Sequence, residues 1–287
     1  MNITAEYKIK NWKSHIVSLD TGINMAYYEC GPDNGTNLML IHGVTDSRVS
    51  WMQMAPILAG SGYHCYIVEY RGNGATDHPD CGRSGYTADM IALDILDLMN
   101  KIHLTGIHVA GHSYGSLITQ ELALLAPDAF LSYTLIDTCV DCRNNPVILE
   151  LINGDGNGFL GIDGYSDHMP ESFIQEWAAT TNEDEEFRTA TLDNVRTMPM
   201  VSWRNLIRGL NQFNNRDIID GITGKIMVMW GTEDTIFTLK DQKEIKLGLT
   251  SCEPKYVDIQ GASHNGFWDS IKNARIYAKI IDNFIND

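Results

Sequence analysis

Short, nearly continuous apolar runs alternate along the first half of the chain with stretches of helical periodicity. Two of these runs, 14–19 and 23–30, flank an Asp-Thr-Gly turn and predict a β-hairpin. Further runs punctuated by glycine or asparagine predict strands that are buried on both faces, at 38–41, 63–68, 107–110 and 133–136. Helical periods lie between them, at 51–59, 87–102 and 116–125. This order predicts an α/β fold with a mostly parallel central sheet and helices on both faces.

The pattern changes after the fourth of these buried runs. Between 139 and 222 no strand-like run appears, and helices are predicted at 148–152, 172–180 and 193–210. The alternation then resumes with strands at 225–230 and 255–259 and helices at 239–249 and 273–285. With 287 residues, the chain is near the upper limit for one hydrophobic core. We therefore predict a core formed by 1–138 and 223–287, interrupted by a helical cap at 139–222.

The pentapeptide Gly111-His112-Ser113-Tyr114-Gly115 joins a predicted strand to a predicted helix. A sharp strand-turn-helix elbow needs glycines on both sides, because the nucleophile adopts a strained conformation and neighbouring side chains would clash. The same turn places Ser113 at a helix N-terminus, where the helix dipole favours developing negative charge. The pattern predicts that Ser113 is a nucleophile, and a purely structural turn is the alternative.

A serine nucleophile needs a histidine base and a group that orients the imidazole. Asp234 follows the predicted strand 225–230, and His264 follows the predicted strand 255–259. The carboxyl ends of parallel strands meet at one edge of a sheet, so these side chains should converge on Ser113. We predict His264 as the base and Asp234 as the orienting acid. Glu233, beside Asp234, and Asp137, at the end of the strand before the insertion, stay open as alternative acids.

These motifs resemble the α/β-hydrolase superfamily over nearly the whole chain. His42-Gly43, after a predicted strand, is similar to the oxyanion loop of that superfamily. The segment 69–74 is similar to its Asp-x-Arg-Gly-x-Gly loop, with Glu69 in place of the aspartate. The resemblance implies an esterase or lactonase with a lid, no metal or organic cofactor, and an oxyanion hole made by the N–H groups of Val44 and Tyr114. A single glycine follows His42, so the glycine-rich loop of some lipases is absent and the small-ester branch is the better likeness.

The substrate is less well defined by the sequence. Ser113 argues against haloalkane dehalogenases and epoxide hydrolases, which resemble this chain but carry an aspartate at the elbow. Hydrolases of C–C and amide bonds, perhydrolases and acyltransferases share the triad and stay open, as does a receptor that keeps the triad and signals by lid movement. Apolar side chains in the insertion favour an uncharged ester or lactone of small to medium size. The candidate substrate-binding residues are Trp51, Trp177, Met200 and Trp203.

The charge balance narrows the classes of partner. The chain has 21 basic and 37 acidic residues, a net charge of −16, and such a chain repels phosphate backbones and anionic lipids. We therefore expect no nucleic-acid or membrane partner. The lack of a long apolar run and the polar first 13 residues predict a cytoplasmic protein. The sequence is also compatible with a homodimer.

Other groups with potential chemistry are interpreted as structural. The six cysteines are predicted to be free thiols, because a chain of this length can bury a core without disulfides. Cys139 and Cys142 form a C-x-x-C, but no second pair completes a zinc site. The loop 153–164 resembles an EF-hand, but Gly164 stands where calcium requires a glutamate. His15 and His64 have no carboxylate at a ligand spacing in the sequence. We therefore predict no metal site.

Overall fold

The computed structural model describes residues 5–287, which form one eight-stranded sheet and the helices around it. The strand order is β1-β2-β4-β3-β5-β6-β7-β8. β2 runs antiparallel to both neighbours, and the remaining pairs are parallel. The strands are β1 (Lys13–Ser18), β2 (Asn24–Cys30), β3 (Thr36–Ile41), β4 (Tyr63–Glu69), β5 (Ile107–His112), β6 (Phe130–Ile136), β7 (Ile226–Gly231) and β8 (Lys255–Ile259). The predicted hairpin and mostly parallel sheet are confirmed.

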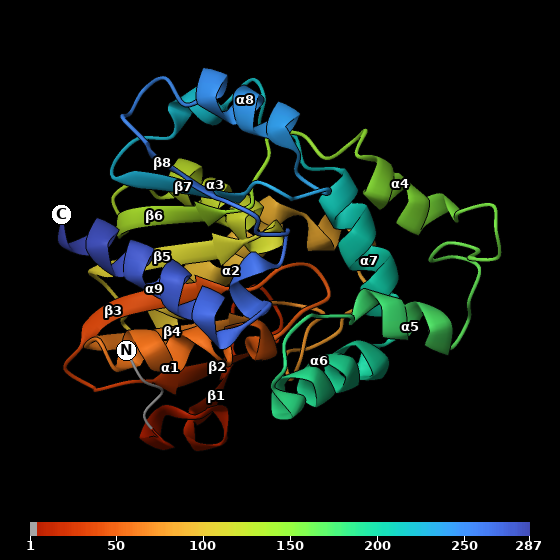
Figure 1. The fold of residues 1–287 in the computed structure, drawn as a ribbon, viewed down its shortest axis with the longest axis horizontal. Coiled ribbons are helices and arrows are strands. Elements are labelled where there is room, and N and C mark those ends of the chain that lie inside the picture. Colours follow the sequence, from red (N-terminus) through yellow and green to blue (C-terminus); the bar gives the residue numbers. More distant parts are fainter. Residues whose placement is uncertain (1–4) are drawn as a thin grey trace.

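Helices cover both faces of the sheet, as the apolar runs of the central strands require (Figure 1). One cluster of buried side chains includes those of α1 and α9, and the other includes those of α2, α3 and α8. These helices are α1 (Met54–Ala59), α2 (Ala88–Lys101), α3 (Tyr114–Leu125), α8 (Leu239–Gly248) and α9 (Ile271–Asn286). Within residues 5–287, every helix is too short or too polar to traverse a lipid bilayer.

Four helices lie between β6 and β7 in the chain and beside the carboxyl ends of the parallel strands (Figure 1). They are α4 (Pro146–Asn153), α5 (Glu171–Trp177), α6 (Glu185–Thr197) and α7 (Met200–Asn211). The two ends of this segment lie side by side, because Cys142 N–H donates to the Phe213 carbonyl at 2.9 Å and Asn215 N–H donates to the Val140 carbonyl at 2.8 Å. The four helices fall within the stretch predicted as a cap, and the bounds 139–222 stay a prediction.

The predicted single helix at 193–210 is wrong, because the chain forms two helices there. Proline lacks an N–H donor and disfavours a helical conformation in the residue before it. Met198, before Pro199, has an extended backbone with ψ at 123°, and α6 ends at Thr197. α6 also begins earlier than predicted, because the Asp184 carboxylate accepts hydrogen bonds from the N–H groups of Glu186 and Phe187 and caps the helix.

A buried ion pair fixes the 69–74 loop against α2. Arg71 Nε lies 2.6 Å from Asp94 Oδ2, and Arg71 Nη2 lies 2.7 Å from Asp94 Oδ1. The Asp94 side chain is fully buried and that of Arg71 is 5% exposed. Removing one partner of such a pair leaves the other charge buried without compensation.

We expect Asp94→Ala to lower the free energy of unfolding by about 3–5 kcal/mol, measured by urea denaturation. Asp89→Ala is the matched control, since Asp89 is an exposed residue of the same helix. An equally large loss in that control would contradict the role of the buried pair.

Candidate active site

The turn between β5 and α3 has the strained geometry of a nucleophile elbow. Ser113 has a φ of +52°, which side-chain-bearing residues rarely adopt. A Cβ on Gly111 would lie 2.1 Å from the Gly115 carbonyl oxygen, and a Cβ on Gly115 would lie 2.3 Å from the Ile41 oxygen. Both positions therefore accept only glycine, and the tight packing holds Ser113 at the end of its strand.

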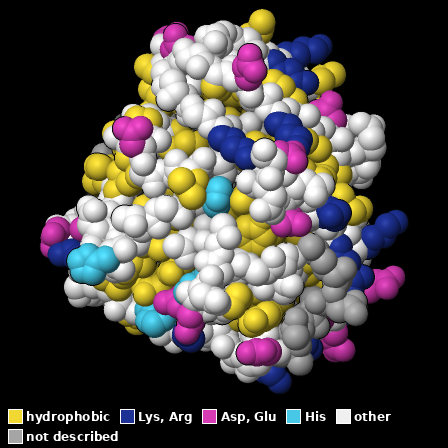
Figure 2. Space-filling model, turned by 90° about the vertical axis from the view of Figure 1, so that its left-hand side faces the viewer, with side chains coloured by type: hydrophobic (Ala, Val, Ile, Leu, Met, Phe, Trp, Pro, Cys, Tyr) yellow, Lys and Arg dark blue, Asp and Glu magenta, His cyan; other side chains and the backbone are white. Residues whose placement is uncertain are grey.

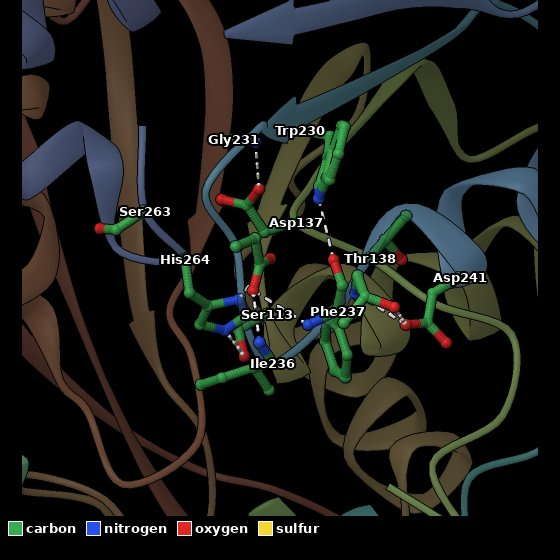
Figure 3. A network of polar contacts seen from close by, with 12 residues as sticks. Ser113, Asp137, Thr138, Trp230, Gly231, Ile236, Phe237, Asp241, Ser263 and His264 are labelled. Carbon is green, nitrogen blue, oxygen red and sulfur yellow. Dashed lines mark hydrogen bonds and ion pairs between the residues drawn. The ribbon is translucent and has the colours of Figure 1, made fainter. Parts of the chain in front are cut away.

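The three predicted triad residues are brought together by three different strand ends. His264 Nε2 lies 2.9 Å from Ser113 Oγ (Figure 3). His264 Nδ1 lies 2.8 Å from Asp234 Oδ2. Asp234 Oδ1 also accepts hydrogen bonds from the N–H groups of Ile236 and Phe237, at 2.8 and 2.9 Å. These bonds fix the carboxylate, which favours a proton on Nδ1 and leaves Nε2 free to accept one from Ser113.

The alternative acids do not occupy this position. Asp137 Oδ1 accepts a hydrogen bond from the N–H of Gly231 at 2.8 Å, pointing away from the imidazole (Figure 3). Burial, together with the nearby charge of Asp234, holds the pKa of Asp137 well above its usual range. Glu233 is exposed. Of the three carboxylates, Asp234 is the one in contact with His264.

The residues predicted to supply the oxyanion donors lie beside Ser113. Tyr114 is the first residue of α3, and Val44 lines the same cavity as Ser113. The hydroxyl of Tyr70 donates to the Gly43 carbonyl at 2.6 Å. The Gly43–Val44 peptide is trans and planar, so this bond also sets the direction of the Val44 N–H, which points the opposite way. Sequence reasoning missed Tyr70, and the oxyanion role of the two N–H groups stays a prediction.

Two buried histidines support the site without touching Ser113. His112 Nε2 lies 2.8 Å from the backbone carbonyl of His264 and holds the loop that carries this histidine. Burial keeps the pKa of His112 well below its usual range, so its ring is a neutral donor in this bond. Burial also lowers the pKa of His42 to about 4, and His42 Nδ1 lies 2.8 Å from the Gly43 carbonyl oxygen.

A cavity of about 490 Å³ opens above Ser113 and His264. Of the four predicted substrate-binding residues, Trp177 lines it. Trp51 does not, because it is fully buried and stacks on Phe267 with ring centroids 5.0 Å apart. Trp203 and Met200 are also buried outside the lining. Trp203 packs edge-on behind Trp177, with ring centroids 5.9 Å apart.

Phe237 is a lining residue that the sequence analysis missed. Its ring lies edge-on to the His264 imidazole, with ring centroids 5.3 Å apart. The one sequence signal for it is its place three residues after Asp234. In that position it shields the histidine from solvent on one side.

The segment between β6 and β7 directly contacts the loop that follows β3. Trp177 Nε1 donates to Thr45 Oγ1 at 2.9 Å, and Asn194 Nδ2 donates to the Thr45 carbonyl at 3.1 Å. Thr45 has a φ of +59°, a strained conformation for a β-branched residue. Two helices of the segment therefore stabilise the conformation of the residue that follows Val44.

Asp46 also lines the cavity, and its carboxyl is half-buried. Burial raises the pKa of Asp46 to about 7, although a hydrogen bond from the Gly43 N–H favours the charged form. In the unfolded chain an aspartate ionises near pH 4. Between these two pH values the native state holds a proton that the unfolded state has released, so stability decreases as the pH rises.

We expect Asp46→Asn to remove this decrease. From pH 5 to pH 8, the variant should gain about 1–2 kcal/mol of unfolding free energy relative to the wild type, an amount reduced by partial solvent exposure. Urea denaturation at the two pH values measures the change. Asp128→Asn, at an exposed position, controls for the loss of one surface carboxylate. Parallel pH profiles for the wild type and Asp46→Asn would contradict the prediction.

On the side of the molecule away from α4 to α7, histidine side chains lie beside acidic ones (Figure 2). Glu29 Oε1 lies 3.1 Å from His15 Nε2, and Glu29 Oε2 lies 2.9 Å from His64 Nε2. Asp33 completes a group of potential metal ligands with Glu29 and His64, and it is paired with Lys13 at 2.6 Å. The sequence analysis found no carboxylate partner for the two histidines, which was wrong because strand pairing supplies Glu29.

The remaining candidate groups lie apart from the triad. Cys139 and Cys142 are buried free thiols with their sulfurs 3.3 Å apart. In the EF-hand-like loop, the Asp155 carboxylate accepts hydrogen bonds from the N–H groups of Asn157 and Phe159, at 2.7 and 2.9 Å. Asp155 thus stabilises its own loop.

Comparison with known proteins agrees with the fold described above. Epoxide hydrolase 2 of Caenorhabditis elegans is 24% identical over 97% of this chain and 81% of its own length. Among solved structures, a hydrolase from Pseudomonas aeruginosa PA01 superposes with a TM-score of 0.80 at 16% identity, covering 98% of this chain and all of its own. An esterase from Exiguobacterium antarcticum gives a TM-score of 0.78 at 16% identity, covering 95% and 99%.

At these identities the solved structures establish the fold alone. A family model shows the family, since residues 36–271 match the α/β hydrolase fold family, and this range includes all three triad positions. The names of the relatives agree with hydrolase chemistry and differ in the bond that is cleaved. The chain belongs to the α/β hydrolase fold family.

Proposed function

We propose that the chain is a serine hydrolase that cleaves a carboxylic ester or lactone through an acyl-enzyme. One observation carries this proposal: Ser113 Oγ, the two nitrogens of His264 and Asp234 Oδ2 form a continuous hydrogen-bonded series, with distances of 2.9 and 2.8 Å. The series lies at the wall of the cavity, where a reacting carbonyl can reach Ser113.

The chemistry follows from these contacts. Ser113 Oγ attacks the carbonyl carbon while His264 Nε2 takes its proton, and the N–H groups of Val44 and Tyr114 stabilise the oxyanion. His264 then protonates the leaving alcohol, which departs and leaves an ester on Ser113. Water attacks this ester with His264 again as the base, which releases the acid and restores the serine. Asp234 holds the imidazole in the required tautomer throughout.

The nature of the nucleophile favours an ester over an epoxide, although relatives bear the name epoxide hydrolase. A serine that opened an epoxide would form an ether with the substrate. An ether has no carbonyl carbon for water to attack, so the serine would not be regenerated. Each enzyme molecule would therefore react with one epoxide molecule only. An acyl group on Ser113 is hydrolysed by the same histidine. The chemistry of Ser113 therefore supports acyl transfer.

The size and lining of the cavity support a small to medium substrate. A volume of about 490 Å³ lies in the usual range for small-molecule sites. Aromatic rings form part of its wall, among them Phe173, Trp177 and Phe237. The oxygens and nitrogens that direct the reaction are concentrated near Ser113.

The test is a comparison of p-nitrophenyl acetate and butyrate, a panel of lactones, and 4-nitrostyrene oxide. We expect repeated turnover of an ester or lactone and no sustained turnover of the epoxide. Sustained hydrolysis of the epoxide alone would overturn the proposal. If no ester or lactone is cleaved, the proposal is also wrong, and the C–C hydrolase, amidase and receptor alternatives take its place.

A further inference from the structure

The carboxylates and basic groups of the protein are unevenly distributed around the active-site cavity, where negative charge predominates. Four carboxylates line the cavity, from Asp46, Glu150, Asp155 and Glu176, and no lysine or arginine does so among the described residues. The stretch 139–222 contains fourteen acidic and six basic residues, so it holds half of the net charge of −16. A cavity with one sign of charge raises the local concentration of ligands with the opposite sign.

The four carboxylates differ in how much charge they offer to a ligand. Hydrogen bonds from the Asn157 and Phe159 N–H groups already engage Asp155 and hold its pKa below the usual range. Asp46 bonds to the Gly43 N–H and, with a pKa of about 7, is only partly ionised near neutral pH. Glu150 on α4 and Glu176 on α5 are exposed at the cavity, and within residues 5–287 neither carboxylate has an ion-pair or hydrogen-bond partner. These two glutamates are available to a ligand.

The basic residues of the same stretch do not neutralise this pair. Each of the six arginines is held by another group: Arg143 by Asp141, Arg188 by the Asn182 carbonyl, Arg196 by Glu171, Arg204 by the Tyr165 carbonyl, Arg208 by Asp163 and Arg216 by Glu244. Glu171 and Glu176 lie on one helix, and Glu171, which does not line the cavity, is the one paired with an arginine. Within residues 5–287, the pairing therefore leaves Glu150 and Glu176 without an arginine partner.

A row of aromatic rings lines the cavity beside these glutamates. Phe159 and Phe173 stack with ring centroids 4.6 Å apart, and Phe173 and Trp177 stack at 5.7 Å. Trp177 directly follows Glu176 in α5. Aromatic faces attract cations. Because the stacked rings cover one another's facing sides, this attraction is limited to the faces that stay uncovered, and the nearby carboxylates supply most of the attraction for an ammonium group.

From this juxtaposition we infer that the active-site cavity takes a substrate with a cationic ammonium group, held between the aromatic row and the carboxylates of Glu150 and Glu176. The inference rests on the proposed function, since the reacting carbonyl of the same molecule lies at Ser113. It departs from the uncharged substrate expected from the sequence: the reacting ester is neutral, but a substituent directed toward α4 and α5 carries a positive charge. An anionic acyl group at the same place would be repelled.

The test separates this inference from the ester-hydrolase proposal. Hydrolysis of neutral p-nitrophenyl acetate reports on the proposed function. Choline and 3,3-dimethylbutan-1-ol serve as competing ligands, because they share size and shape and differ in having a charged nitrogen or a neutral carbon. At about 10 mM salt, where screening is weak, we expect the inhibition constant of choline to be about tenfold lower than that of the neutral alcohol.

The difference should shrink at about 0.5 M salt, because the charges are exposed and screened. In the double variant Glu150→Gln/Glu176→Gln, the inhibition constant of choline should rise to near that of the neutral alcohol. Glu171→Gln is the matched control on the same helix and should leave the preference for choline unchanged.

Equal inhibition of the wild type by the two alcohols would overturn the inference while leaving the ester-hydrolase proposal intact. A preference for choline that survives the double variant would overturn the assignment to these two glutamates. Absence of p-nitrophenyl acetate hydrolysis, together with failure of the other esters and lactones, would overturn the proposed function and this inference with it.

Discussion

Replacement of Ser113 by alanine is expected to lower kcat for p-nitrophenyl acetate by roughly 10⁵-fold. The Cβ of alanine has no oxygen to attack the carbonyl, so no acyl-enzyme forms. The backbone N–H groups of the oxyanion site remain, and they sustain the slow residual hydrolysis by water that is usual when a triad member is removed. Steady-state kinetics measure the change, and mass spectrometry after a short incubation with the ester detects the acyl group on the wild type alone.

Two controls make this result specific. Ser172→Ala removes an exposed hydroxyl from α5 and should leave kcat unchanged. A melting temperature for Ser113→Ala at or above that of the wild type excludes unfolding as the cause, since alanine at this strained position removes no buried partner other than His264 Nε2. Full turnover by Ser113→Ala would remove the serine mechanism.

Asp234→Asn is expected to lower kcat by roughly 10⁴-fold, and the cause lies in how the amide must orient. Two N–H groups, of Ile236 and Phe237, donate to Asp234 Oδ1. In the variant these donors require the amide oxygen, so the amide NH₂ faces His264 Nδ1. Nδ1 must then accept a hydrogen bond, which moves the imidazole proton to Nε2. In that tautomer His264 cannot take the proton of Ser113.

Asp137→Asn is the matched comparison, because it makes the same change in a neighbouring buried carboxyl. Burial and the charge of Asp234 raise the pKa of Asp137 and so favour its protonated form, and an amide resembles a protonated carboxyl in shape and charge. We expect kcat to change less than about tenfold, far below the effect at Asp234. If the two variants lost equal activity, the assignment of Asp234 as the orienting acid would be wrong.

The parts of this molecule that the sequence predicts well are those set by local pattern. The β/α alternation placed each strand within a few residues, and the glycines around Ser113 identified the elbow because backbone atoms leave no room for a side chain there. Pro199 marked a break that the helical periodicity of 193–210 obscured, because apolar spacing continues across the proline.

The parts that could not be predicted depend on side chains brought together from distant segments. Trp51, Trp177 and Trp203 are indistinguishable as apolar residues, and only packing decides that Trp177 faces the cavity. The pairing of Glu29 with His15 and His64 follows from the register of three neighbouring strands, which apolar periodicity does not specify.

The short backbone bridge that joins 140–142 to 213–215 has a consequence for how this chain can change over evolutionary time. A segment whose two ends already touch can be lengthened, shortened or exchanged for another without moving either neighbouring strand. More than half of the residues that line the cavity are thus encoded in the roughly seventy codons between the two sides of the bridge, whereas Ser113, Asp234 and His264 are encoded outside them. The lining of the cavity can therefore change through this one stretch, provided that the contacts of Trp177 and Asn194 with Thr45 are kept.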